Sequence, residues 1–421
     1  MRCVASGRWL LLAWIGACGG KDHVPRSQAN VAAPVVGTPE VSTPASPVVG
    51  DAAPTRAVVE LVGDPLDGYP RLQAGDGRTL WDLHAVGDRI YLGHGDATAN
   101  TGPTDVIALH LATGDFRVEA TLQEEAIMSY RQHGDRLFLP GVDPVGSPDD
   151  GAIYVRRDPG RDGEWTTLVV PDAVHVSDVA VHDGRLFAAT QRQPNVAAVV
   201  ESADDGATWR THVVPGWRAN ALFELDGALY VGTFGGGASR LEGGAFRWVA
   251  SPFGPSAAAG APKLEADVDR ELQETVIDRV VTCAGATWAI VLHGSVGYGY
   301  GSSSLYRLGV ATGEVTRERA SLDGRVTDLF VWEDRCHAVA NVELEQGWLV
   351  RVLAAGEGGE WETLVEAEAP AIAQSGTRVG GDFYFGLGCF GGCGPGSGGV
   401  ARVSARGSLG LDDAGAARSR E

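Results

Sequence analysis

One pattern of apolar and polar positions recurs along the chain. It consists of an alternating apolar strand, a tight turn rich in Gly and Asp, and a second alternating strand that carries a ring-bearing residue. Period-two alternation on both sides of such a turn is typical of a β-hairpin. The pattern predicts seven hairpins, at residues 83–92, 130–139, 179–188, 222–231, 280–289, 329–338 and 376–385.

A ring-bearing side chain occupies the same point of the second strand in every hairpin, at intervals of roughly 43 to 58 residues that match β-propeller blades. We expect it to pack between neighbouring blades, where a flat side chain buries most area. Further hairpins at 106–122 and 305–319 predict four strands per blade. The sequence thus predicts an all-β fold, a single β-propeller of about seven four-stranded blades, closed by residues 57–62 pairing with 399–412. The ring positions are Tyr91, Phe138, Phe187, Tyr230, Trp288, His337 and Tyr384.

The chain begins like a secretory signal. Arg2 and Arg8 precede an apolar run that is shorter than the roughly 20 residues of a membrane span. The segment Ile15-Gly16-Ala17-Cys18 resembles a bacterial lipobox. The resemblance implies a signal peptide at residues 1–17, cleavage before Cys18, and a lipoprotein whose Cys18 carries a diacylglyceryl group and an acyl chain such as palmitate. An ordinary signal with an incidental cysteine is the alternative.

Residues 18–56 are rich in Pro, Ala, Val, Ser and Thr and contain no aromatic residue. Such a composition is typical of a disordered, semi-extended tether. We therefore expect an exported propeller, residues 57–421, that is held to a membrane by its N-terminal lipid. Gly19 rather than Asp after the cysteine favours the outer membrane or cell surface if the cell is Gram-negative.

The charge balance excludes one class of partner. The chain has 34 Lys and Arg against 54 Asp and Glu, a formal net charge of −20. A surface of this sign repels phosphate backbones, so we expect no nucleic acid partner.

Four cysteines remain in the predicted mature chain besides the lipidated one. In an exported protein they indicate two disulfides. Cys389 and Cys393 enclose a short flexible loop and are expected to pair locally, which leaves Cys283 for Cys336. A zinc half-site at Cys389 and Cys393 is the alternative, although no second pair stands at metal-ligand spacing.

The turn of the third repeat carries a recognisable motif. Ser202, Asp204, Gly206, Thr208 and Trp209 form the pattern S-x-D-x-G-x-T-W. The motif resembles the Asp-box of the BNR, sialidase-like superfamily of β-propellers. Physically, the Asp204 carboxylate can bond N–H groups across the turn while the indole packs beneath it. The resemblance implies a propeller whose Asp-boxes lie on the face away from any active site.

The resemblance does not extend to sialidase chemistry. Sialidases of that superfamily have six blades, an arginine triad with an early R-I-P motif, and a Tyr-Glu pair. The early candidate here, Tyr69-Pro70-Arg71-Leu72, departs from that motif. The predicted count of seven blades fits the non-enzymatic members of the broader group better.

Long glycine-rich loops predict where a ligand would bind. The loops at 93–104, 141–151, 293–304 and 386–399 all belong to the same end of the predicted ring. Long loops on a rigid scaffold are often functional, and glycine lets backbone approach a ligand closely. We also expect an amphipathic helix within 251–277. The candidate binding residues are His94, Asp96, Asn100, Tyr298 and Tyr300; the alternative is that these loops merely connect strands.

One aligned position at the start of each first strand supplies candidate chemistry. It holds Asp82, Asp178 and Asp328 in three repeats and Arg279 in a fourth. If these side chains line the channel, the carboxylates could bind Ca²⁺, hold ordered water, or pair with Arg279. No metalloprotease, P-loop or serine-hydrolase motif accompanies them.

Three functions stay open at this stage. The leading one is an anchored propeller that binds a glycan, peptide or protein through its loop-rich face without catalysis. The second is a carbohydrate-active hydrolase or lyase that uses the three aspartates with Arg279, which requires two carboxyl groups about 5–10 Å apart. The third is an extracytoplasmic assembly scaffold, for which a broad apolar patch would be the evidence.

Overall fold

The computed structural model describes residues 57–73, 77–96, 99, 101–146, 150–234, 237–249, 275–293, 302–311, 314–356, 358–390 and 392–404. The chain divides into two compact units, Met1–Ala53 and Pro54–Glu421, and all described residues belong to the second. Their regular structure consists of β-strands and one 3₁₀-helix, Pro70–Leu72. None of the described helices is both long and apolar enough to cross a bilayer. The predicted all-β class is confirmed.

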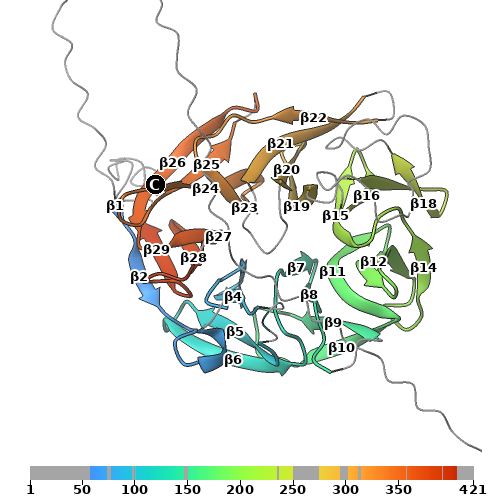
Figure 1. Ribbon diagram of the computed structural model, residues 1–421, viewed down its shortest axis with the longest axis horizontal. Coiled ribbons are helices and arrows are strands. Elements are labelled where there is room, and N and C mark those ends of the chain that lie inside the picture. The colour runs from blue at the N-terminus through green and yellow to red at the C-terminus, as the bar shows by residue number, and fades with distance from the viewer. Residues whose placement is uncertain are drawn as a thin grey trace, which may run out of the picture. The chain divides into compact units, whose positions relative to one another are not determined.

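Seven four-stranded antiparallel blades follow one another around a ring (Figure 1). The four strands are consecutive in sequence in six blades, whereas the seventh takes β2 (Glu60–Gly63) from the N-terminal end, and the sheet of the sixth gains β1 (Ala57–Val58) as a fifth, parallel strand. The first four blades are β3 (Asp82–Val86), β4 (Arg89–Gly93), β5 (Thr104–His110), β6 (Asp115–Leu122); β7 (Arg131–His133), β8 (Arg136–Pro140), β9 (Asp150–Arg157), β10 (Trp165–Pro171); β11 (Ala173–His182), β12 (Arg185–Arg192), β13 (Val196–Ser202), β14 (Arg210–Val213); and β15 (Ala219–Leu225), β16 (Ala228–Thr233), β17 (Ala238–Glu242), β18 (Ala245–Val249). The last three are β19 (Thr275–Cys283), β20 (Ala286–His293), β21 (Ser302–Ala311), β22 (Glu314–Arg319); β23 (Arg325–Trp332), β24 (Arg335–Glu343), β25 (Trp348–Ala355), β26 (Trp361–Ala369); and β27 (Ile372–Val379), β28 (Asp382–Gly388), β29 (Val400–Ser404) with β2 (Glu60–Gly63).

Each predicted hairpin forms the first two strands of a blade. In the third blade the two turn residues, Asp183 and Gly184, have φ of 49° and 71°. Two consecutive left-handed residues make a turn whose twist matches that of the flanking strands. Asp and Gly adopt this conformation at low cost, which explains why the turns are rich in them.

The predicted ring-bearing column lies between blades. Tyr91 of the first blade is fully buried and packs in one core cluster with Tyr130 and Leu137 of the second. His337 belongs to the same column and is 1 % exposed, and burial lowers its pKa to about 4. A buried neutral imidazole there acts as a packing group. All seven column members are buried, so this prediction is confirmed.

The ring closes with strands from both ends of the described chain. β2 pairs antiparallel with β29 and completes the seventh blade. The short strand β1 (Ala57–Val58) instead adds to β26 of the sixth blade. The predicted closure by residues 57–62 is therefore confirmed for its second half and corrected for its first. Residues 405–412 lie outside the described residues.

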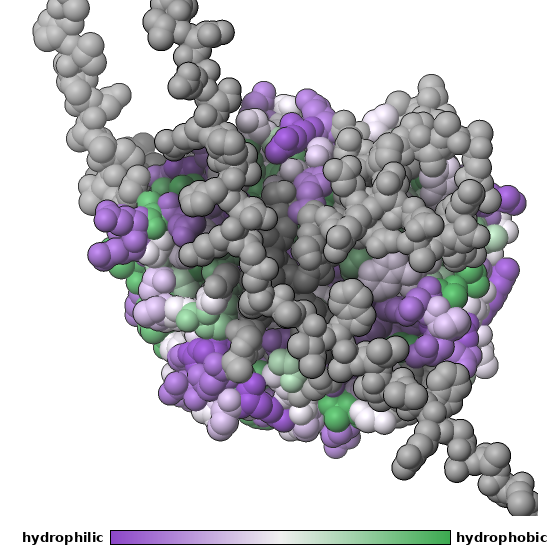
Figure 2. All heavy atoms as spheres, in the orientation of Figure 1, coloured by the Kyte–Doolittle hydropathy of each residue, from purple (hydrophilic) through white to green (hydrophobic). Residues whose placement is uncertain are grey.

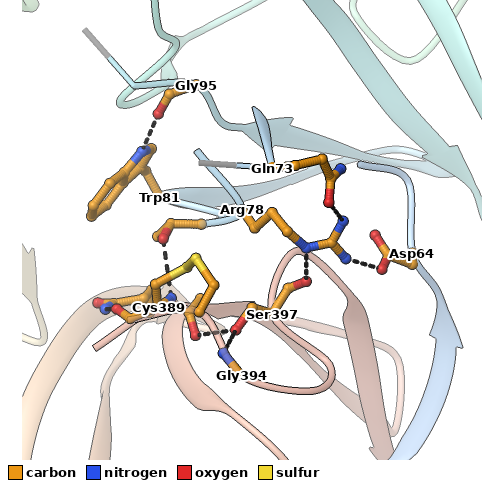
Figure 3. The surroundings of a disulfide bond; sticks show 12 residues. Asp64, Gln73, Arg78, Trp81, Gly95, Cys389, Gly394 and Ser397 are labelled. Atoms are coloured by element: carbon orange, nitrogen blue, oxygen red, sulfur yellow. Dashed lines mark hydrogen bonds and ion pairs between the residues drawn. A yellow bond between two sulfur atoms is a disulfide. The ribbon is translucent and has the colours of Figure 1, made fainter. Parts of the chain in front are cut away.

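Both expected disulfides are present. Cys283 and Cys336 join the fifth blade to the sixth, and Cys389 bonds to Cys393 within the seventh. The sulfurs are therefore not zinc ligands. Figure 3 shows that Arg78, just before the first blade, lies between Asp64 and the carbonyl of Ser397. The Cys389 amide also donates to Thr79 Oγ1 at 3.1 Å, so this corner fastens the seventh blade to the first.

The expected helix within 251–277 is corrected at its C-terminal end. Val276 and Ile277 belong to β19, and both are buried against neighbouring blades. Residues 251–274, with the rest of that prediction, lie outside the described part of the chain.

Candidate functional site

A cavity of about 320 Å³ opens on the axis of the ring, and every blade contributes to its wall. Its rim includes Trp217, which precedes a first strand, and Leu292 and Val142, which lie at or just after the end of a second strand. The cavity therefore lies at the end of the ring where the long loops were predicted. At this end a ligand would reach side chains from all seven repeats at once.

The cavity floor is made by a repeated β-bulge. In blades three to seven, the pairing of the first two strands skips one residue at the same point. A bulge leaves its extra residue unpaired and redirects its side chain. In the first two blades Trp81 and Met128 occupy the corresponding point before the first strand. The skipped residues, all of which line the cavity, are Ser177, Asn220, Asp278, Thr327 and Gln374.

The aspartates predicted to line the channel are instead buried between blades. Asp82, Asp178 and Asp328 are 3 %, 1 % and 1 % exposed. Each carboxylate accepts a hydrogen bond of 2.7 or 2.8 Å from a main-chain N–H of the next blade; the donors are Tyr130, Leu222 and Gly376. These contacts make each aspartate a clasp between adjacent blades. For the three aspartates the channel-lining prediction is wrong by one residue, because the preceding residues Trp81, Ser177 and Thr327 line the cavity. For Arg279 the prediction is confirmed.

Arginines neutralise these clasps. Arg279 reaches Asp82 at 2.9 Å and Asp328 at 2.7 Å, and Arg131 reaches Asp178 at 2.6 Å. Burial raises the pKa of Asp328 to about 7, while the Arg279 guanidinium opposes this rise. Of the alternatives left open, arginine pairing is the one observed. No group of three or more metal-ligating side chains occurs among the described residues.

Two further charged groups face the cavity. Asp278 lines the cavity and is exposed to solvent there. Desolvation nevertheless raises the pKa of Asp278, against the opposing effect of Arg279, Arg131 and Arg325. The Arg325 guanidinium lies 4.6 Å from the ring centre of Phe390, and burial lowers its pKa.

Aromatic side chains form one wall. Trp217 is 39 % exposed, and its ring centre lies 4.5 Å from that of Phe234. Arg218 lies over the same Phe234 ring at 5.7 Å and donates from Nε to Ser177 Oγ at 3.0 Å. Sequence reasoning missed these residues because they precede β15 and follow β16, outside the repeated hairpin. The adjacent Trp217 and Arg218, just before a predicted strand, are the sequence feature from which this wall could have been identified.

Two of the predicted binding residues are placed inside the first loop. His94 is 1 % exposed, its Nε2 lies 2.7 Å from the Asp105 carbonyl, and burial lowers its pKa to about 4. Asp96 is 7 % exposed and accepts a hydrogen bond from the Ala99 amide. Both side chains are buried and hydrogen-bonded within the loop, and their assignment as binding residues stays a prediction. Asn100, Tyr298 and Tyr300 lie outside the described residues.

The turn with the Asp-box pattern joins β13 to β14. Asp204 accepts from the amide and the hydroxyl of Thr208 at 2.8 and 2.6 Å, and Ser202 Oγ accepts from the Gly206 amide at 2.8 Å. Trp209 Nε1 donates to the Val169 carbonyl of the preceding blade. This turn lies at the end of the strands opposite the cavity, so it contributes structure and not the site.

Comparison with known proteins yields structural likeness only. No protein-family model matches the chain, and no curated protein does. Among solved structures, a virginiamycin B lyase from Staphylococcus aureus is 11 % identical over 78 % of this chain and 96 % of its own, with a TM-score of 0.49. The WD40 propeller domain of Doa1 is 12 % identical over 82 % and 96 %, with a TM-score of 0.48, and YCF48 from Cyanidioschyzon merolae is 12 % identical over 82 % and 98 %, with a TM-score of 0.47.

Proposed function

We propose that this protein is an exported, membrane-anchored propeller that binds a glycan, a peptide or a protein in the axial cavity without catalysing a reaction. One observation carries the proposal. The cavity combines aromatic walls with hydrogen-bonding and charged side chains from seven blades, but Asp278 is the single carboxyl group among the described residues of its lining. Concave sites with apolar walls and a few convergent polar groups are typical of ligand binding.

The geometry disfavours the hydrolase or lyase alternative. A glycosidase needs two carboxyl groups that both reach the substrate. Asp82 and Asp328 are held by Arg279 and by main-chain N–H groups, and neither lines the cavity. Asp278 alone therefore lacks the partner that acid–base hydrolysis of a glycoside requires.

The part of the surface that Figure 2 leaves visible does not favour the scaffold alternative. There the described residues are mostly hydrophilic, and the hydrophobic ones form small, separate groups. An assembly surface would instead expose a broad apolar area. The axial cavity is the better-supported site.

Trp217 provides the test of the binding site. The purified full-length protein is screened against glycan and peptide arrays, and hits are titrated with wild type, Trp217→Ala and Trp248→Ala. Trp248 is a matched control, because it is similarly exposed at 42 % but lies on the outer strand β18 and does not line the cavity. We expect Trp217→Ala to weaken binding about tenfold or more and Trp248→Ala to leave it unchanged. Equal effects, or turnover of a bound ligand, would contradict the proposal.

The anchor is tested separately. We expect Cys18→Ala to abolish labelling of the protein by radioactive palmitate and to move it from the membrane fraction to the soluble exported fraction, because two or three acyl chains are needed for stable attachment. A membrane-bound, unlabelled wild type would contradict the lipid anchor but leave the cavity proposal intact.

A further inference from the structure

Two side chains of opposite charge in the axial cavity have no hydrogen-bond or ion-pair partner among the described residues. The Asp278 carboxylate forms no hydrogen bond or ion pair with them and is exposed to the cavity. Arg325 likewise forms none, and its buried Nε has no acceptor. An unsatisfied buried donor costs free energy, as does a partly desolvated charge. Both groups therefore gain most when a ligand supplies the missing partners.

Asp278 and Arg325 do not satisfy each other. They are near enough for each charge to shift the other's pKa, yet they form no ion pair. Burial raises the pKa of Asp278 and lowers that of Arg325. Both shifts favour the neutral form, as expected when nearby opposite charges do not fully offset the cost of desolvation. Both side chains line the same cavity, so one molecule bound there can contact both.

The neighbouring arginines already have partners. Arg131 pairs with Asp178, and Arg279 is shared by Asp82 and Asp328. These ion pairs offset part of the charge of both arginines, which still act electrostatically on Asp278. A purely anionic ligand at Arg325 would bring a second negative charge close to Asp278, and a purely cationic ligand at Asp278 would bring a second positive charge close to Arg325. A ligand that carries both charges avoids either repulsion.

We propose that the cavity binds an unblocked short peptide, whose free ammonium group contacts Asp278 and whose terminal carboxylate contacts Arg325. The inference rests on the proposed binding function and names its ligand class. Trp217 and Phe234 supply an apolar surface for the side chains of the peptide. A cavity of about 320 Å³ is at the small end of the range for ligand sites and suits two or three residues.

Three probes of nearly equal size test this on the wild-type, full-length protein. Dialanine carries both charges, N-acetyl-dialanine only the negative one, and dialanine amide only the positive one. We expect titration calorimetry to show that dialanine binds about tenfold more tightly than either blocked form, as loss of one charge-assisted contact implies. Equal affinity for the three probes, or no binding of dialanine, would overturn the inference.

Isosteric variants assign each contact. Asp278→Asn should remove the preference for dialanine over its N-acetyl form, and Arg325→Gln should remove the preference over the amide. Asp183→Asn and Arg247→Gln are the matched controls, since both side chains are highly exposed and neither lines the cavity. If either cavity variant keeps its preference while unfolding at the wild-type temperature, the assigned contact is wrong.

A further probe separates this inference from the proposed function. If glucuronate or a neutral oligosaccharide binds in a Trp217-dependent way while dialanine does not, the cavity is a binding site and the peptide assignment fails. If dialanine binds as predicted and loses affinity in Trp217→Ala, both are supported. If no probe binds and Trp217→Ala changes nothing on the arrays, both are overturned.

Discussion

At the scale of single residues, carboxylates of the same type have opposite roles set by their surroundings. Asp178 accepts hydrogen bonds from two main-chain amides and forms an ion pair with Arg131. Asp278 is exposed to the cavity and has no such partner among the described residues. Buried charges are tolerated when paired and hydrogen-bonded. The first kind of aspartate therefore stabilises the ring, and the second is free to meet a ligand.

We expect Asp178→Ala to lower the free energy of unfolding by roughly 3 kcal/mol or more, because it leaves Arg131 without its partner and two amides without an acceptor. Asp178→Asn should cost less, since it keeps one acceptor. Urea denaturation measures both, with Asp183→Asn as an exposed control that should change stability by less than about 0.5 kcal/mol. An unchanged midpoint for Asp178→Ala would show that the clasp does not hold the blades.

Glu124 gives a prediction on pH. It is fully buried, and burial raises its pKa to about 7 despite hydrogen bonds from the Tyr154 hydroxyl and the Asp143 amide. The folded protein thus binds a proton that the unfolded chain releases between pH 4.5 and 7. The stability from this group is present below pH 4.5 and is lost as the pH rises to about 7.

Glu124→Gln should therefore flatten the decline of unfolding free energy across that window. Urea melts at pH 4.5, 5.5 and 7 test this, with the exposed Glu343→Gln as control. The expectation fails if the variant and the wild type lose stability in parallel as the pH rises.

At the scale of elements, the sequence predicted hairpins, blade count and the interblade column, because each depends on local alternation and turn residues. Its alignment of the first strands was also consistent from blade to blade. It placed Arg279 correctly at the cavity, but for the three aspartates it placed the channel one residue too late, since alternation assigns faces only while the pairing register is continuous. The bulges interrupt that register at Ser177 and Asp278 and at their counterparts, and nothing in the composition of those positions announces them.

The two disulfides differ in what they connect, since one links two blades and the other closes a short loop within one blade. Cys283–Cys336 spans 53 residues and links two blades, whereas Cys389–Cys393 spans four. Cross-linking distant positions restricts the unfolded chain more than closing a short loop. We expect the Cys283→Ala, Cys336→Ala double variant to lose about 2–4 kcal/mol of stability, and the Cys389→Ala, Cys393→Ala variant to lose less. Calorimetric melting ranks the two, and the reverse order would contradict the assignment.

At the scale of the whole molecule, the ring depends on the pairing of β2 with β29. We expect deletion of residues 1–63 to leave the seventh blade without its outer strand and to replace one cooperative unfolding transition by a broad one. Deletion of residues 1–56 keeps β1 and β2 and serves as the control. A sharp transition in both truncated proteins would show that closure is dispensable.

The pairing of β2 with β29 also determines how late in synthesis the protein can finish folding. Glu60 and Arg402 pair across the closing strands although 342 residues separate them. A chain made from its N-terminus holds β2 without a partner until almost all of the sequence has been synthesised, and contacts so distant along the chain form slowly. If the chain is exported unfolded, as proposed above, late closure would keep it competent for passage, and the ring would be completed only after the chain had crossed the membrane.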